Sequence, residues 1–408
     1  MGSKPTVRFP TWADDGTAGQ VIDPGAVKQA LGWNDDEQPP AHWWNWWKNA
    51  VGQYISAFGV YADIERRNFQ RLLMADAFTG AYFTQNSIES DGATRAQMVS
   101  GLTAQASGLQ MFLVSDPDGG FGWAYPASGA LSTGAFRQVI DVAFDVSQFC
   151  GLCDDSNSRA SGDAFATAVT TRGLGWSGTV TDQRLGAANS LFVAVKRASD
   201  ADIEVAITVN PLTTPWGLAV TPVIGNDTFI GRPEYGNGDW LIPAAGGVIR
   251  STDNGANWST IAPPAGPGFI HAVKYSAAQS RWLAVGSTAG GNGFWYSTDG
   301  TVWTLGTTSG AMPPTASILW RRMAVDAAGL VTAIGGDTTF PSARGQSALA
   351  LQTNAASNDI EMITVPFGES VTQGWDIVHH DGTYTVSGGN SDAAVQLPLI
   401  WKSLRIAP

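Results

Sequence analysis

Residues 251–258 read Ser251-Thr252-Asp253-Asn254-Gly255-Ala256-Asn257-Trp258, and residues 297–303 repeat them in a form one residue shorter. The tryptophans that end these two stretches lie 45 residues apart. Going backwards along the chain, Trp216 and Trp176 each end a turn-rich stretch, after intervals of 42 and 40 residues. A period of about 40 to 45 residues leaves room for four short strands and is typical of one blade of a β-propeller.

A second pattern recurs between these turns: an apolar strand, a polar turn and another apolar strand. Six segments carry it, at residues 141–155, 185–198, 229–247, 271–287, 323–336 and 375–389. Such paired runs predict antiparallel hairpins. We therefore expect a mainly β fold, a propeller of six blades over residues 136–408, with seven as the alternative. Residues 79–135 are expected to be a linker with a ring-closing strand, and the turn at 115–123 is the segment that closes the ring or belongs to a seventh blade.

The two repeated turns have a physical explanation. An aspartate in a turn accepts hydrogen bonds from backbone N–H groups of the same turn, glycine permits a positive φ, and tryptophan packs the turn onto the strands. We expect a structural role for Ser251, Asp253, Gly255 and Trp258, and for Ser297, Asp299, Gly300 and Trp303. This pattern resembles the Asp-box of the BNR-repeat superfamily, which includes sialidases. The resemblance implies a propeller fold and says little about activity.

The N-terminal residues 1–78 have a different character. Asp23, Pro24 and Gly32 predict a short helix, and a longer helix is expected to begin after Pro39-Pro40, with apolar residues spaced by three and four. Six of the 17 tryptophans lie in this segment: Trp12, Trp33, Trp43, Trp44, Trp46 and Trp47. One interpretation is a helix packed on its own propeller. The interpretation that we favour is docking into a larger assembly or self-association, because so small a segment cannot bury six indoles alone.

The order of short motifs in this segment points to a family. Pro-Thr-Trp-Ala at 10–13, Ala-Leu-Gly-Trp at 30–33, Pro-Pro-Ala at 39–41, Trp-Asn-Trp-Trp at 44–47 and Val-Gly-Gln at 51–53 follow one another. This order resembles the N-terminal segment of tailed-bacteriophage tail-fibre and other virion structural proteins, over about 55 of the 408 residues. The resemblance implies attachment to the virion and a homo-oligomer, with a trimer favoured.

Composition narrows the choice of partners. Lys and Arg number 23 against 35 Asp and Glu, a formal net charge of −12, which disfavours nucleic acid as a partner. No run of about 20 apolar residues is present, so we expect no membrane insertion. The first residues lack a signal peptide, and we expect synthesis in the host cytoplasm followed by incorporation into the virion. Cys150 and Cys153 form a single C-x-x-C on an expected strand, and we interpret them as buried thiols rather than a metal or redox site.

We expect no catalytic residues, no metal and no cofactor. A sialidase-like site needs an arginine cluster for a carboxylate, and the arginines here are scattered in sequence. Glycoside cleavage needs two carboxyl groups facing one cavity, and the expected innermost strands at 271–276, 321–326 and 375–380 carry one acid or none each. The leading hypothesis is a virion appendage that exposes its propeller, with Tyr235, Trp240 and Trp295 as candidate contacts to a host-surface glycan. The alternatives are a glycan-cleaving enzyme on the virion and a purely structural connector.

Overall fold

The computed structural model describes residues 69–72, 83–91, 97–103, 113–115, 123–124 and 139–403, the last range without 146, 154–155, 163–168, 177–179, 199–202, 220–228, 246, 263–267, 311–317, 338–346, 353, 366–371, 381–382 and 391–397. No residue in the described part is helical, and none of its elements is a helix long and apolar enough to span a membrane. The helical anchor expected in residues 1–78 therefore lies outside the described residues, apart from 69–72. The chain divides into two compact units, and the larger one, residues 71–402, holds the sheets described below except for the terminal strand residues Phe69, Gln70 and Ser403.

The described strands form seven sheets, each made mainly of strands consecutive in sequence. The first three sheets consist of β2 (Phe83–Ser90), β3 (Gln97–Thr103), β4 (Leu113–Ser115) and β5 (Trp123–Ala124); β6 (Val139–Asp145), β7 (Gln148–Cys153), β8 (Asn157–Ser161) and β9 (Thr170–Gly173); and β10 (Val180–Ala188), β11 (Leu191–Ala198), β12 (Ile203–Thr208) and β13 (Gly217–Leu218). The next two consist of β14 (Glu234–Gly236), β15 (Asp239–Ala244), β16 (Gly247–Ser251) and β17 (Ser259–Ile261), and of β18 (Gly268–Ser276), β19 (Arg281–Thr288), β20 (Gly291–Ser297) and β21 (Thr304–Leu305).

The last two sheets depart from this simple order. The sixth contains β23 (Ile318–Val325), β24 (Val331–Asp337), β25 (Ser347–Leu351) and β26 (Asp359–Val365), and β22 (Thr307–Ser309) adds a fifth strand parallel to β26. The seventh contains β27 (Thr372–His380), β28 (Thr383–Asn390) and β29 (Pro398–Ser403), with β1 (Phe69–Leu72) as the strand beside β29. A strand from near the start of the described chain thus completes the sheet formed by its end.

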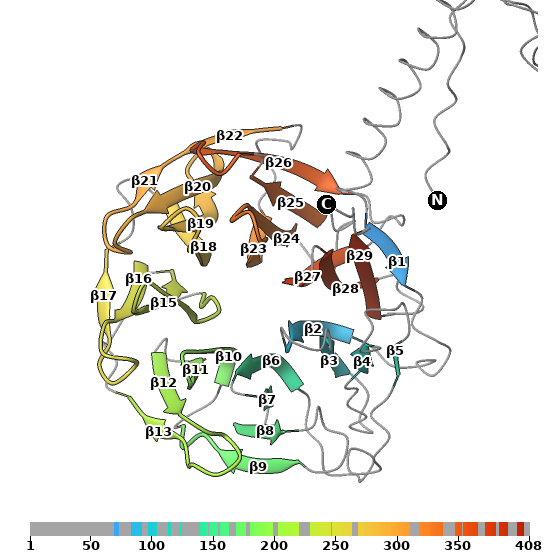
Figure 1. Cartoon of the computed structure of the whole chain (residues 1–408), viewed down its shortest axis with the longest axis vertical. Coiled ribbons are helices and arrows are strands. Elements are labelled where there is room, and N and C mark those ends of the chain that lie inside the picture. Colours follow the sequence, from blue (N-terminus) through green and yellow to red (C-terminus); the bar gives the residue numbers. More distant parts are fainter. Residues whose placement is uncertain are drawn as a thin grey trace, which may run out of the picture. The chain divides into compact units, whose positions relative to one another are not determined.

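The sheets are arranged around a common centre as the blades of a propeller (Figure 1). In the blades whose first strand is labelled in Figure 1, namely those that begin with β2, β6, β10, β18, β23 and β27, that strand lies nearest the centre and the later strands lie toward the rim. The six hairpins expected from the sequence are β6–β7, β10–β11, β14–β15, β18–β19, β23–β24 and β27–β28, and all six are present. The alternative of seven blades is the one observed, because β2–β5 form a further sheet.

Two of the expected boundaries are wrong. Residues 79–135 hold a complete four-stranded blade rather than a linker, and the turn at 115–123 joins β4 to β5 within that blade. The ring is closed instead by β1, which lies inside the range 1–78 assigned to the anchor. The physical reason is that β2 reads Phe-Thr-Gln-Asn-Ser-Ile-Glu-Ser and therefore lacks the apolar alternation that marked the other inner strands.

The apolar core is divided into layers between neighbouring blades. One layer joins the third and fourth blades and includes Val193, Ile242 and Trp240. Another joins the fifth and sixth blades and includes Phe294, Trp320 and Leu283. Each blade alone would leave two apolar faces in water, so burial in these layers is what holds the blades together.

Candidate functional site

Four of the inner strands share a local irregularity that is followed directly by a charged residue. The pairing register between the first and second strand shifts immediately before Asp141 on β6, Asp182 on β10, Arg322 on β23 and Asp376 on β27. A β-bulge of this kind rotates the chain and redirects the next side chain. Four blades therefore present a charged residue at the same point of the hairpin, directly after the bulge.

Asp141 and Asp376 tie neighbouring blades together. Oδ1 of Asp141 accepts a hydrogen bond from the N–H of Val142 at 2.9 Å, and its Oδ2 accepts one from the N–H of Leu185 on the next blade at 2.8 Å. Asp376 repeats this arrangement with the N–H of Ile377 at 2.8 Å and the N–H of Ile88 at 2.9 Å. Both aspartates are buried, and each satisfies a backbone donor of its own blade and one of the following blade.

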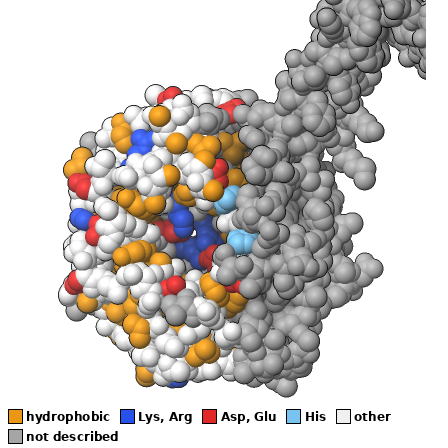
Figure 2. Space-filling model, in the orientation of Figure 1, with side chains coloured by type: hydrophobic (Ala, Val, Ile, Leu, Met, Phe, Trp, Pro, Cys, Tyr) orange, Lys and Arg blue, Asp and Glu red, His pale blue; other side chains and the backbone are white. Residues whose placement is uncertain are grey.

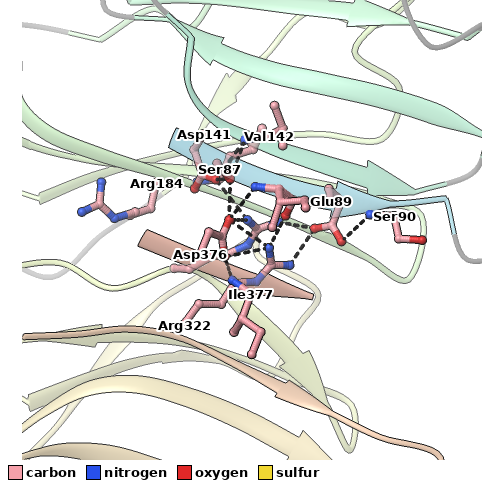
Figure 3. Close-up of polar contacts among 12 residues, drawn as sticks. Ser87, Glu89, Ser90, Asp141, Val142, Arg184, Arg322, Asp376 and Ile377 are labelled. Atoms are coloured by element: carbon pink, nitrogen blue, oxygen red, sulfur yellow. Dashed lines mark hydrogen bonds and ion pairs between the residues drawn. The ribbon is translucent and has the colours of Figure 1, made fainter. Parts of the chain in front are cut away.

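Ser87 on β2 lies between these two aspartates (Figure 3). Its Oγ is 2.7 Å from Oδ1 of Asp141 and 2.6 Å from Oδ2 of Asp376. Because a hydroxyl has one proton, it donates to one carboxylate at a time. The first blade is thus held to the second and to the seventh through one buried serine.

Two arginines bring the fourth and sixth blades into the same cluster. Arg232, which precedes β14, donates to Oε2 of Glu89 at 2.5 Å and to Oδ1 of Asp141 at 3.0 Å. Arg322 donates to the same oxygen of Glu89 at 2.7 Å, to both oxygens of Asp376 at 3.1 Å and to the carbonyl of Ile88 at 2.6 Å. We call Ser87, Glu89, Asp141, Arg232, Arg322 and Asp376 the central cluster. It draws on five of the seven blades and contains three carboxylates and two guanidiniums. Figure 3 labels all of its members except Arg232.

The electrostatics of the central cluster favour the ionised forms. Burial raises the pKa of the Glu89 carboxyl, but the charges of Arg322 and Arg232 outweigh it, and the pKa is lowered overall. Burial also opposes the charge of Arg322, yet Asp376 and Glu89 raise the pKa of its guanidinium above the ordinary value. Buried charges persist only when they are paired in this way. Glu89 is therefore held as a carboxylate and is not poised to donate a proton.

Further charges surround the central cluster. Arg184 pairs with Asp182 at 2.7 Å, and Lys274 pairs with Glu234 at 2.5 Å. Burial and the charge of Arg184 lower the pKa of Arg321 to about 10, whereas Asp182 opposes that shift. Figure 2 shows Lys and Arg side chains gathered at the hollowed centre of this face, with acidic side chains beside them. The inner strands thus form a polar channel whose charges are largely compensated.

His271 is a neutral member of this channel wall. Burial, and then the charge of Arg321, lowers the pKa of its imidazole to about 4. Its Nδ1 accepts a hydrogen bond from the N–H of Trp320 at 3.3 Å, which fixes the other ring nitrogen toward Ser287 Oγ at 3.4 Å. At neutral pH this histidine links the fifth and sixth blades and carries no charge.

The arrangement changes one expectation from the sequence. Three carboxylates, Glu89, Asp141 and Asp376, do meet at the centre of the ring, whereas we expected no paired acids there. The reason is that they come from β2, β6 and β27, of which only the last was considered as an acid-bearing inner strand. Arginines or backbone N–H groups hold all three, so the arrangement suits inter-blade bonding better than acid–base chemistry. The described residues include no group of three His, Cys, Asp or Glu side chains placed to hold a metal ion.

The repeated turn at 251–258 shows the hydrogen bonds expected of its aspartate. Ser251 Oγ donates to Oδ1 of Asp253 at 2.8 Å and accepts from the N–H of Gly255 at 2.9 Å. The N–H of Asn257 donates to the same Asp253 oxygen at 2.9 Å. The backbone and side-chain hydrogen bonds from Asn257 lower the pKa of Asp253 to about 2. Gly255 has a φ of 85°, and Trp258 is buried with its Nε1 donating to the carbonyl of Gly255 at 2.9 Å.

The shorter copy has the same design. Asp299 Oδ1 accepts from Ser297 Oγ at 3.0 Å and from the N–H groups of Thr301 and Val302 at 2.8 and 3.0 Å. Gly300 has a φ of 71°, and Trp303 is buried. A Cβ added at Gly300 would lie 3.2 Å from Leu241 of the preceding blade, so the turn packs closely between blades. Both turns lie between the third and fourth strands of their blades, away from the central cluster.

The candidate glycan contacts are mostly inaccessible, which corrects that expectation. Trp240 has 0% of its surface exposed and Trp295 has 3%, because both side chains pack in the layers between blades. Tyr235 is partly buried and packs against the ring of Trp240, with the ring centroids 5.3 Å apart. Aromatic residues beside glycine-rich turns here fill the core. The six candidate anchor tryptophans (Trp12, Trp33, Trp43, Trp44, Trp46 and Trp47) lie outside the described residues.

Neither Cys150 nor Cys153 forms a disulfide, and both are fully buried. Burial raises the pKa of the Cys150 thiol, against a smaller effect of its hydrogen bond with Ser158. A thiol in such surroundings is a weak nucleophile. This agrees with a packing role for the C-x-x-C segment on β7.

No protein-family model matches the chain, and no curated protein matches it. Similar solved structures include one described as YCF48 bound to D1 peptide, with 11% identity and a TM-score of 0.54 over 82% of this chain and 94% of that one. Another is YCF48 from Cyanidioschyzon merolae, with 12% identity and a TM-score of 0.54 over 82% of this chain and 98% of that one. At such identities the likeness concerns the fold alone. Together with the seven sheets, it shows that the chain is a β-propeller.

Proposed function

We propose that this protein is a non-enzymatic component of a tailed-bacteriophage particle, docked by its tryptophan-rich N-terminal segment and exposing its propeller for attachment to the host surface. The docking half of the proposal is supported by the order of motifs in residues 10–53, which resembles virion structural proteins. The non-enzymatic half is supported by the central cluster, where arginines and backbone N–H groups engage every carboxylate.

The central cluster is the observation that carries the choice against an enzyme. A glycosidase needs one carboxyl group kept protonated near neutral pH and a second one free to act as base or nucleophile. The pKa of Glu89 is instead lowered, and the oxygens of Asp141 and Asp376 accept hydrogen bonds from backbone N–H groups of two blades each. A propeller of this fold is described as bound to a peptide, so binding a partner without chemistry is compatible with the architecture.

The test of docking uses a shortened chain that keeps the ring intact. Removal of residues 1–67 deletes all six candidate tryptophans and retains β1, which the seventh blade needs. We expect this protein to fold with the far-UV spectrum of a β protein and to be absent from particles assembled in its presence. A full-length protein with Trp43, Trp44, Trp46 and Trp47 changed to serine should behave in the same way. Normal incorporation of either protein would refute the docking role.

The full-length protein and the shortened protein together also test self-association. Sedimentation equilibrium of the full-length chain should give an oligomer, with a trimer favoured, and the shortened chain should sediment as a monomer. Binding of each to immobilised host-surface glycan then separates attachment from a connector role. Retention of the propeller on the glycan supports attachment, and retention on no host surface component supports the connector.

A further inference from the structure

The guanidinium groups of Arg232 and Arg322 converge on a single oxygen atom. They come from the fourth and sixth blades, and each places an Nη2 within 2.7 Å of Oε2 of Glu89. Two guanidiniums that point at one position form a strong binding site for a carboxylate, because each N–H bond there is charge-assisted. Glu89 of the first blade fills this position in the present structure.

Glu89 differs from the other two acids of the central cluster in how it is held. Asp141 and Asp376 each bond to an N–H of the following blade, and their side chains are only 5% and 7% exposed. Glu89 is 16% exposed, and among the described residues its only other hydrogen-bond donor besides the arginines is the N–H of its own neighbour Ser90, at 3.1 Å. Asp141 and Asp376 therefore hold blades together, whereas the Glu89 carboxylate neutralises the arginines without bonding to another blade's backbone.

The donors around this position are not all used. Nε of Arg322 is buried and has no hydrogen-bond partner among the described residues, although the rest of that guanidinium makes several bonds. A buried donor without a partner costs free energy, so the hydrogen-bonding capacity of this guanidinium is not fully used. The site is thus built for a carboxylate and is incompletely satisfied by the glutamate that occupies it.

We propose that Arg232 and Arg322 form a binding site for one small carboxylate anion, which Glu89 occupies from within the chain. This inference goes beyond the proposed function, because it concerns the central channel and holds whether or not the chain is part of a particle. A ligand reaches the site when the Glu89 side chain is removed. The ligand class is a monocarboxylate, because the position between the two Nη2 groups holds one carboxylate and the two aspartates already balance the charge of the two arginines.

The test replaces Glu89 and supplies the missing carboxylate in solution. In Glu89→Ala, acetate corresponds to the two carbons and two oxygens that the substitution deletes beyond Cβ. We expect the thermal midpoint of this variant to rise saturably with sodium acetate, by about 2 °C or more over sodium chloride at equal ionic strength. Formate should act more weakly, and propionate, which is one carbon too long, should also act more weakly.

Two variants make the outcome specific. Glu89→Gln keeps the site filled by an uncharged side chain, so acetate should shift its midpoint no more than chloride does. Glu89→Ala combined with Arg232→Gln removes half of the site, and the acetate effect should disappear. Equal effects of acetate and chloride on Glu89→Ala would overturn the proposal, as would an acetate effect of the same size in the double variant.

Folding itself provides a second readout if Glu89→Ala proves unstable. Denatured Glu89→Ala should then refold in acetate and fail to refold in chloride, because acetate restores the carboxylate acceptor that the Nη2 groups of the two arginines lose. Recovery of equal amounts of native protein in the two salts, including no recovery in either, counts against the site.

Discussion

The backbone N–H of Ile88 donates a hydrogen bond of 2.9 Å to Oδ2 of Asp376, across a separation of 288 positions in the sequence. It joins β2 of the first blade to β27 of the last, so it closes the ring on its inner side. Asp141 makes the equivalent bond to Leu185 between the second and third blades. Closure of the ring therefore relies on the strand β1 toward the rim and on a buried aspartate near the axis.

Replacing Asp376 with alanine should cause a large loss of stability. The change removes the acceptor for Ile88 and leaves the buried Arg322 without its main partner, and breaking a buried ion pair on one side costs about 3–5 kcal/mol. Urea denaturation followed by tryptophan fluorescence should show the decrease in the free energy of unfolding. Asp376→Asn, which keeps an acceptor oxygen, should lose less.

The matched control is Asp359→Ala. Asp359 is exposed on β26 and its side chain lies outside the central cluster, so the change should alter stability by no more than about 0.5 kcal/mol. If Asp376→Ala and Asp359→Ala unfold at the same urea concentration, the bond between the first and last blades does not contribute to closing the ring.

The turn carboxylate of Asp253 should make stability depend on pH in the acid range. Hydrogen bonds from Asn257 lower its pKa from the ordinary value of 3.8 to about 2 in the folded protein. A lowered pKa means that the stabilisation is fully present above the ordinary value and is lost as the pH falls through about 2. Asp253→Ala should therefore cost about 1 kcal/mol at pH 6, because the turn is exposed, and the difference from wild type should shrink as the pH approaches 2.

Trp258 packs beneath the same turn, and replacing it with alanine should lower the stability more than replacing Asp253 does. The indole is 6% exposed and packs among residues of the third and fourth blades, so Trp258→Ala should cost about 3–5 kcal/mol through the cavity that it leaves. The midpoint of thermal unfolding and the binding of any propeller ligand should both be measured for the two turn variants. Together they distinguish a structural role of these residues from a role in ligand binding. Loss of binding at an unchanged midpoint would assign these residues to a binding site instead.

The two thiols should be inert in the native protein. Cys150 and Cys153 are fully buried, and burial raises the pKa of the Cys150 thiol, so a thiol-specific reagent should find neither until the chain unfolds. Titration with Ellman's reagent should give no reaction without denaturant and two thiols per chain in guanidinium chloride. Rapid reaction of one thiol in the native state would contradict the buried assignment.

The pattern of apolar residues was enough to predict six of the seven hairpins. The remaining hairpin, β2–β3 of the first blade, was not predicted because β2 lines the charged centre. Ser87 and Glu89 belong to the central cluster, and Ile88 between them is a buried apolar residue. A strand whose channel side is charged and whose other side packs on a blade has too few apolar positions for its length to be recognised. The polar side chains that make β2 hard to recognise in the sequence are the ones that bond the first blade to other blades.

The central cluster itself was not predicted, because its members are separated by up to 289 positions and one sequence carries no record of their proximity. A signal was nevertheless present. Asp141, Arg322 and Asp376 each stand immediately before the apolar run of a recognised hairpin, at the residue that follows the bulge. The prediction that Trp240 and Trp295 contact a glycan was wrong because sequence proximity to a turn does not show exposure. Both residues lie beside turns in sequence, but their side chains are buried in the layers between blades.

The last prediction separates a binding protein from a glycan-cleaving enzyme. Purified full-length protein, incubated with host polysaccharide or lipopolysaccharide, should release no new reducing ends, because the described channel acids are tied to arginines or to backbone N–H groups. A general acid must hold a proton near neutral pH, and the arginines beside Glu89 lower its pKa instead. The decisive comparison is Glu89→Gln, which removes the most exposed of the three carboxylates. Turnover by the wild type that falls by two or more orders of magnitude in Glu89→Gln, with the fold unchanged, would make this cluster a catalytic site and the protein an enzyme.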